Sequence, residues 1–206
     1  MTSKEQLHNA VEHFREWAKR SYPAQRFGEW ETNYEDWESL YTASRTLLQS
    51  ESDSWDSESK KLLLYVIARD NEVGLVTSLL NESQAFALAS FSTAEGEPDA
   101  KWQLAVRLGE LPVRDATEQL LLDFATDSNE YVRRRAMMTL ADLGCKSAER
   151  LVVAAWNTRD EYQRMASLHV LERLNSPHLN EYLELASADG REYLVKMAKN
   201  IRETNR

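Results

Sequence analysis

The sequence predicts an all-α protein: an α-solenoid of stacked antiparallel helix pairs with an N-terminal helical cap. Apolar residues recur at helical spacing along most of the 206 residues, which include only six Gly and four Pro. Alternation typical of strands is scarce. In the second half a Glu-Tyr pair recurs every 31 residues. A period of that length, built from paired helices, is typical of a solenoid.

Before the repeats, residues 1–92 form divergent helices. Apolar spacing predicts them over residues 4–20, 33–49, 57–69, 72–80 and 83–91. The second of these helices is expected to begin with a capping box between Thr32 and Glu35. A Gly/Pro loop is expected over residues 92–99.

The repeats are expected over residues 97–200. Glu130-Tyr131, Glu161-Tyr162 and Glu192-Tyr193 set the register, and a small residue recurs six positions after each Glu, at Ala136, Ser167 and Ala198. One unit is a helix, a turn near Gly144 or Asn175, and a second helix. We expect residues 1–206 to be a single domain that contains both parts.

Residues 129–144, NEYVRRRAMMTLADLG, resemble the first helix of a HEAT or armadillo-type repeat. The shared pattern is an acid or Asn, a Val-Arg pair, a small Ala and a final Leu-Gly. The later units depart from it at Gln163-Arg164 and at Asn175. The resemblance implies a scaffold that binds macromolecules along a concave face, and it implies no particular chemistry.

No catalytic motif is present, so we predict no enzyme activity, no cofactor and no metal site. A single cysteine, Cys145, excludes an internal disulfide and a thiolate zinc site. The four histidines lack the spacing of metal ligands. No run of about 20 apolar residues exists, and the N-terminus is polar, so we expect a cytoplasmic protein that does not enter a membrane.

Charge is concentrated in the first half of the chain. The net charge is -9, from 34 acids and 25 bases, and residues 29–58 hold nine acids and one base. Such a segment steers a basic partner toward it, whereas nucleic acid requires positive surface. The one basic cluster is Arg133-Arg134-Arg135, and we expect Arg133 and Arg134 to pair with acids of the next repeat.

The acidic-aromatic segment 29–58 is the candidate partner-binding surface. Trp30 and Trp55 lie between polar or acidic neighbours, which makes them candidate interface anchors. The alternative is that each folds back over a neighbouring helix as a staple, an arrangement that is common. The candidate residues are Glu29, Trp30, Glu31, Glu35, Asp36, Glu38, Asp53, Trp55, Asp56 and Glu58.

Three functions compete. The first is a non-catalytic module that binds and neutralises a basic toxin such as a nuclease. In size, acidity and acidic-aromatic N-terminal segment, the chain resembles immunity proteins of bacterial polymorphic or contact-dependent toxin systems. The second is a HEAT-repeat adaptor or assembly factor. The third is a repeat-fold DNA glycosylase or a lyase, which the negative charge disfavours.

Overall fold

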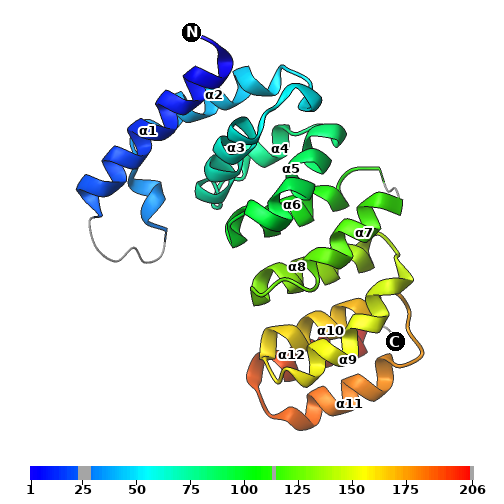
Figure 1. The fold of residues 1–206 in the computed structure, drawn as a ribbon. Coiled ribbons are helices and arrows are strands. Elements are labelled where there is room, and N and C mark those ends of the chain that lie inside the picture. The colour runs from blue at the N-terminus through cyan, green and yellow to red at the C-terminus, as the bar shows by residue number, and fades with distance from the viewer. Residues whose placement is uncertain (23–28, 113–114, 205–206) are drawn as a thin grey trace. The chain divides into compact units, whose positions relative to one another are not determined.

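The computed structural model describes residues 1–22, 29–112 and 115–204, and every regular element within these ranges is a helix (Figure 1). The predicted all-α fold class is therefore confirmed. The chain divides into two compact units, Met1–Leu111 and Pro112–Arg206.

The first unit contains six α-helices and two short 3-10 turns within its described residues. They are α1 (Ser3–Ser21), η1 (Trp30–Asn33), α2 (Trp37–Leu48), η2 (Ser52–Ser54), α3 (Ser57–Arg69), α4 (Leu75–Leu79), α5 (Glu82–Glu95) and α6 (Pro98–Gly109). Helix α1 packs against α2 and α3, and α3 packs in turn against α5 and α6. This arrangement makes α3, whose apolar run is Leu62–Ala68, the centre of the unit.

The start of α2 differs from the prediction. Instead of a capping box with Glu35, the Thr32 hydroxyl donates to the carbonyl oxygen of Glu29 at 2.7 Å, within η1. The helix begins only at Trp37, after Asp36. The physical reason is tertiary packing. Trp30 and Tyr34 are both buried, and the η1 conformation directs both side chains into the core.

Two further boundaries also differ. Helix α5 runs on to Glu95 and α6 begins at Pro98, so the predicted loop over 92–99 shrinks to two residues. Pro suits the first helical turn, where its missing N–H is no loss. Helix α4 is shorter than the predicted 72–80 because Gly74 adopts a left-handed φ of +64° and the helix starts after it.

Over residues 115–204 the second unit is a set of three helix pairs. They are α7 (Asp115–Phe124) with α8 (Glu130–Asp142), α9 (Glu149–Asn157) with α10 (Glu161–Arg173), and α11 (Leu179–Asp189) with α12 (Glu192–Thr204). A 3-10 turn, η3 (Lys146–Ala148), precedes α9. Helix α10 packs against both α8 and α12, so the second helices of the three pairs lie in one row.

The 31-residue register is visible in the packing of this row. Ala136, Ser167 and Ala198 are all fully buried, as a position of close helix approach requires. Gly144 and Asn175 end α8 and α10 with positive φ, +75° and +50°. Asn is among the few residues that adopt this conformation readily. The turn is therefore preserved at Asn175, although the repeat has Asn there and not Gly.

The Glu of the first two Glu-Tyr pairs connects neighbouring repeats. The Gln163 side-chain amide donates to Glu130 Oε1 at 3.1 Å, and the Leu194 backbone N–H donates to Glu161 Oε1 at 3.2 Å. Each carboxylate thus accepts a hydrogen bond from a residue 33 positions later. Helix α6, where the repeats were expected to begin, packs with α3 and α5 inside the first unit. The single-domain organisation stays a prediction.

Candidate functional site

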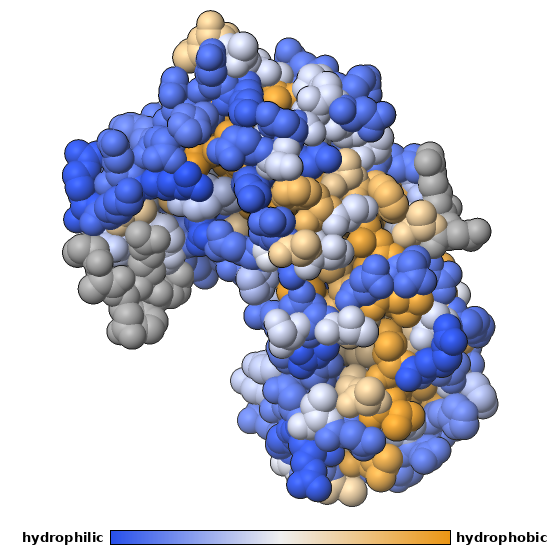
Figure 2. All heavy atoms as spheres, in the orientation of Figure 1, coloured by the Kyte–Doolittle hydropathy of each residue, from blue (hydrophilic) through white to orange (hydrophobic). Residues whose placement is uncertain are grey.

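The acidic segment folds into two groups of acids at the two ends of α2. Glu29, Glu35 and Asp36 lie before this helix, and Glu51, Asp53 and Asp56 lie after it. A helix of 12 residues is about 18 Å long. Because that length exceeds the screening distance of about 8–10 Å at physiological salt, the two groups act on a partner as separate patches. Figure 2 shows mostly hydrophilic residues on the visible face over α1 and α2.

Some of the candidate acids are already paired inside the first unit. Asp36 lies 3.7 Å from His13 Nδ1, Glu38 lies 3.1 Å from Arg45 Nη1, and Asp56 accepts from the Lys4 ammonium. The Lys4 hydrogen bond, with that from the Ser59 backbone, lowers the pKa of Asp56. These three acids therefore form ion pairs within the first unit, and part of their charge is neutralised there.

Five acids of the segment make no ion pair with any residue that the structure describes. All five are exposed: Glu29, Glu35, Glu51, Asp53 and Glu58. Their mutual repulsion is not relieved within the described part of the chain. They are the members of the segment whose charge is available to a partner.

The two tryptophans are not exposed anchors, which corrects the expectation from sequence. Trp30 is 7% exposed and stacks on Trp17, with ring centroids 5.9 Å apart and planes 15° from parallel. Trp55 is 5% exposed, and its indole N–H donates to Ser50 Oγ at 2.8 Å. Both fold back over the unit, because burying an aromatic ring is worth more than the local polarity around it.

Glu31 is also buried, at 5% exposed, which removes it from the binding surface. Its Oε1 lies 3.6 Å from Arg69 Nη1, and Arg69 pairs with Glu97 as well. Burial raises the pKa of the Glu31 carboxyl despite the guanidinium beside it. Glu31 therefore joins η1 to α3 inside the protein.

The basic cluster of the second unit is committed to internal contacts, although not those predicted. Arg133 donates to the backbone carbonyls of Asp127 and Ser128, both at 2.8 Å. Arg134 pairs with Glu130 of its own helix, not with an acid of the next repeat. Its guanidinium also lies between the rings of Tyr131 and Tyr162, 4.7 and 4.9 Å from their centroids.

Within the described residues, no group of three His, Cys, Asp or Glu side chains could hold a metal ion. His169 lies 3.2 Å from Asp142, and burial raises the pKa of the Cys145 thiol, which makes it a poorer nucleophile. None of the helices described is both long and apolar enough to cross a membrane.

Sequence reasoning missed a pocket of about 230 Å³ in the first unit. It is lined by residues from the α3–α4 turn, from α4 and from α6, among them Asn71, Glu72, Trp102 and Arg107. These residues lie about 30 positions apart, and no shared pattern links them. Only the fold of α4 against α6 brings them together.

Comparison with known proteins supports the predicted repeats and assigns no particular function. Residues 117–200 match a family model of HEAT repeats. No curated protein and no solved structure matches the chain. The match and the paired helices together support HEAT-like helical repeats over residues 117–200.

Proposed function

We propose that this chain binds a basic protein through its first unit and neutralises it without chemistry of its own. The most specific form of the proposal is an immunity protein whose partner is a toxin with a basic cleft, such as a nuclease. The observation that carries it is the set of five exposed carboxylates that have no counter-ion among the residues that the structure describes. Unit 1, residues 1–111, has 19 acids and 11 bases, so it supplies nearly all of the net charge.

Electrostatics gives the acids two effects on a basic partner. Their field raises the association rate, and contact with a cationic surface relieves the repulsion among them. Carboxylates at the two ends of α2, about 18 Å apart, can occupy positions where a nuclease holds two phosphates several nucleotides apart. Such occupation blocks the partner's substrate and needs no catalytic group.

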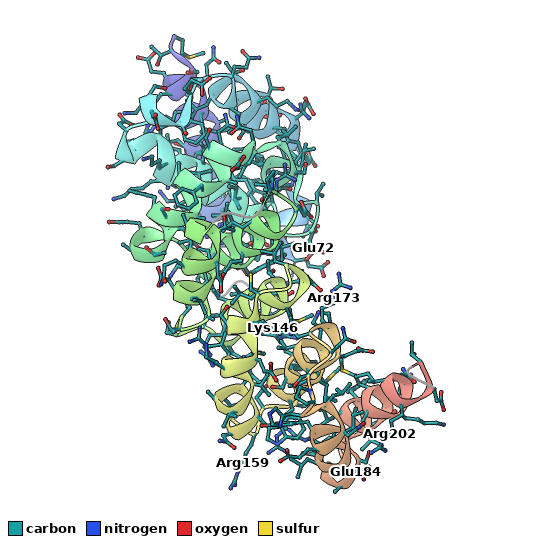
Figure 3. All side chains as sticks on the ribbon, turned by 90° about the vertical axis from the view of Figure 1, so that its right-hand side faces the viewer. Glu72, Lys146, Arg159, Arg173, Glu184 and Arg202 are labelled. Carbon is teal, nitrogen blue, oxygen red and sulfur yellow. The ribbon has the colours of Figure 1, made fainter. Side chains whose placement is uncertain are left out.

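The test compares charge reversal in the two units. One variant carries Glu29→Lys, Glu35→Lys and Asp53→Lys, at three exposed acids that form no ion pair within residues 1–22, 29–112 and 115–204. The matched control carries Glu172→Lys, Glu184→Lys and Glu203→Lys in the second unit, which changes the net charge equally. Glu184 pairs there with Arg202 at 2.7 Å, and both residues are labelled in Figure 3.

Proteins captured from the source cells by the wild-type chain are identified by mass spectrometry, and their association kinetics are measured. We expect a basic partner whose on-rate falls at least tenfold with the first variant and less than threefold with the control. Adding the chain at equal concentration should abolish the partner's own activity. A neutral or acidic partner, or equal effects of both variants, would contradict the proposal.

A second candidate, an adaptor that uses the repeats, is favoured by exposed apolar side chains of the second unit. Val153 on α9 and Leu185 on α11 are 57% and 46% exposed, and Tyr162 and Tyr193 are exposed on α10 and α12. Figure 2 shows hydrophobic residues gathered on the visible face over α9. An adaptor partner would be lost on Val153→Asp and kept by the triple reversal in the first unit.

A further inference from the structure

The pocket between α4 and α6 has polar walls whose hydrogen-bond donors are largely used inside the protein. The Thr77 hydroxyl donates to Gln103 Oε1 at 3.1 Å, and the Gln103 amide donates to the carbonyls of Ile67 and Asp99. Arg107 donates twice to the Leu80 carbonyl and once to Glu110. These side chains therefore have little left to donate to a ligand.

Acceptors, by contrast, remain available in the same pocket. Asn71 Oδ1 is buried and accepts no hydrogen bond from any residue that the structure describes. Glu72, labelled in Figure 3, is exposed and lines the pocket, and its carboxylate forms no ion pair with a described residue. With Glu110 and Arg107, the lining carries a net charge of -1. A ligand that fits this chemistry is a donor and a cation.

The remaining walls of the pocket are apolar. Val73, Trp102 and Val106 line it, and Val73 is 71% exposed next to the left-handed turn at Gly74. An alkyl chain packs on such walls, and a guanidinium stacks favourably on an indole ring. The arginine side chain combines an alkyl stem with a planar group of five donors.

We propose that this pocket receives an arginine side chain of the basic partner, with its guanidinium between Trp102, Asn71 and Glu72. The inference rests on the proposed function for the origin of the arginine, and it adds the anchor that Trp30 and Trp55 do not supply. A buried arginine is among the residues that most often dominate the binding energy of an interface.

The pocket is tested with a small probe, so that the test does not depend on the partner. N-acetyl-arginine amide is titrated into the full chain at 150 mM salt while the six indole N–H signals are followed by NMR. Trp102→Phe assigns the relevant signal. N-acetyl-citrulline amide, which has the same shape without the charge, is the matched control ligand.

We expect a saturable shift of the Trp102 signal with the arginine probe and an affinity at least tenfold weaker for the citrulline probe. Glu72→Gln should weaken arginine binding at least threefold, whereas Glu16→Gln, at an exposed acid of α1 outside the pocket, should not. No shift, equal shifts with both probes, or equal affinity in Glu72→Gln would overturn the inference. A partner that binds the Glu72→Gln chain normally would overturn it too, and would leave the proposed function standing.

Discussion

The two units of this chain use charged residues in opposite ways. Residues 1–111 carry a net charge of -8 and leave five acids of the segment 29–58 exposed and without an intrachain ion pair among the described residues. Residues 112–206 carry 15 acids and 14 bases. There Glu130 and Glu161 accept hydrogen bonds from the next repeat. In the second unit these charges join repeats, whereas the five acids of the first unit have no counter-ion among the described residues.

The cores differ as well, since the first unit is built around aromatic rings. Phe14 is fully buried and lies with its ring centroid 4.8 to 6.1 Å from those of Trp17, Trp30, Tyr34, Trp37 and Tyr65. The second unit instead buries aliphatic and small residues around Trp156. An aromatic cluster concentrates the stability at one point, and a repeat array distributes it.

The largest effect is therefore expected from Phe14→Ala. Removing this ring leaves a cavity against five aromatic neighbours and should lower the free energy of unfolding by about 3–5 kcal/mol, measured by urea denaturation. Hydrogen exchange should accelerate over residues 1–111. Phe86→Ala, at a ring that is 37% exposed on α5, is the control and should cost less than about 1 kcal/mol. Similar losses for the two variants would show that the cluster is not the centre of the unit.

In the second unit the corresponding change is Leu140→Ala. Leu140 is fully buried on α8, so its truncation should cost about 2–5 kcal/mol in urea denaturation, with faster hydrogen exchange within residues 112–206. Leu185→Ala, on the exposed side of α11, should change the free energy of unfolding by less than about 0.5 kcal/mol. If Leu140→Ala costs no more than Leu185→Ala, the 31-residue register is wrong.

The comparison also shows what sequence can reveal. Helical spacing predicted α1, α3 and α8 because each has its own apolar face, and the recurrence of Ala136, Ser167 and Ala198 predicted the close helix packing. The predicted exposure of Trp30 was wrong because its stacking partner, Trp17, lies on another helix, and the polarity of neighbouring residues gives no information about that contact.

The predicted start of α2 was wrong for a similar reason. The burial of Trp30 and Tyr34 outweighed the local capping pattern. The pocket beside Trp102 could not be predicted at all, since it exists only where α4 meets α6.

Each unit holds an acid beside arginine, Glu31 in the first and Asp189 in the second, and the stabilising contributions of the two acids should depend on pH in opposite directions. Burial raises the pKa of Glu31 above its ordinary 4.5 despite Arg69. Hydrogen bonds from Arg191 and Arg164 lower the pKa of Asp189 from its ordinary 3.8 to about 2. The stabilising contribution of Glu31 is therefore present below pH 4.5 and lost as the pH rises through its folded pKa, whereas that of Asp189 is present above pH 3.8 and lost as the pH falls toward 2.

Urea denaturation from pH 3 to pH 7 measures this contrast with Glu31→Gln and Asp189→Asn. Relative to Glu31→Gln, the wild type should lose stability as the pH rises. Relative to Asp189→Asn, it should gain stability over the same range and be about 1–3 kcal/mol more stable at pH 7. The same pH slope for both variants would show that the two acid–arginine pairs are not opposite in kind.

The smallest effect should come from the turns that end α8 and α10. Gly144 has a φ of +75°, and a Cβ added there would meet no atom within 4 Å, so the cost of Gly144→Ala is conformational and should be about 1 kcal/mol. At Asn175, Gly should change the free energy of unfolding by less than about 0.5 kcal/mol, whereas Ala should cost about as much as it does at Gly144. Thermal unfolding of the three variants checks this order. If Asn175→Ala is harmless while Gly144→Ala is costly, the turns after α8 and α10 are not equivalent, although both residues have a positive φ.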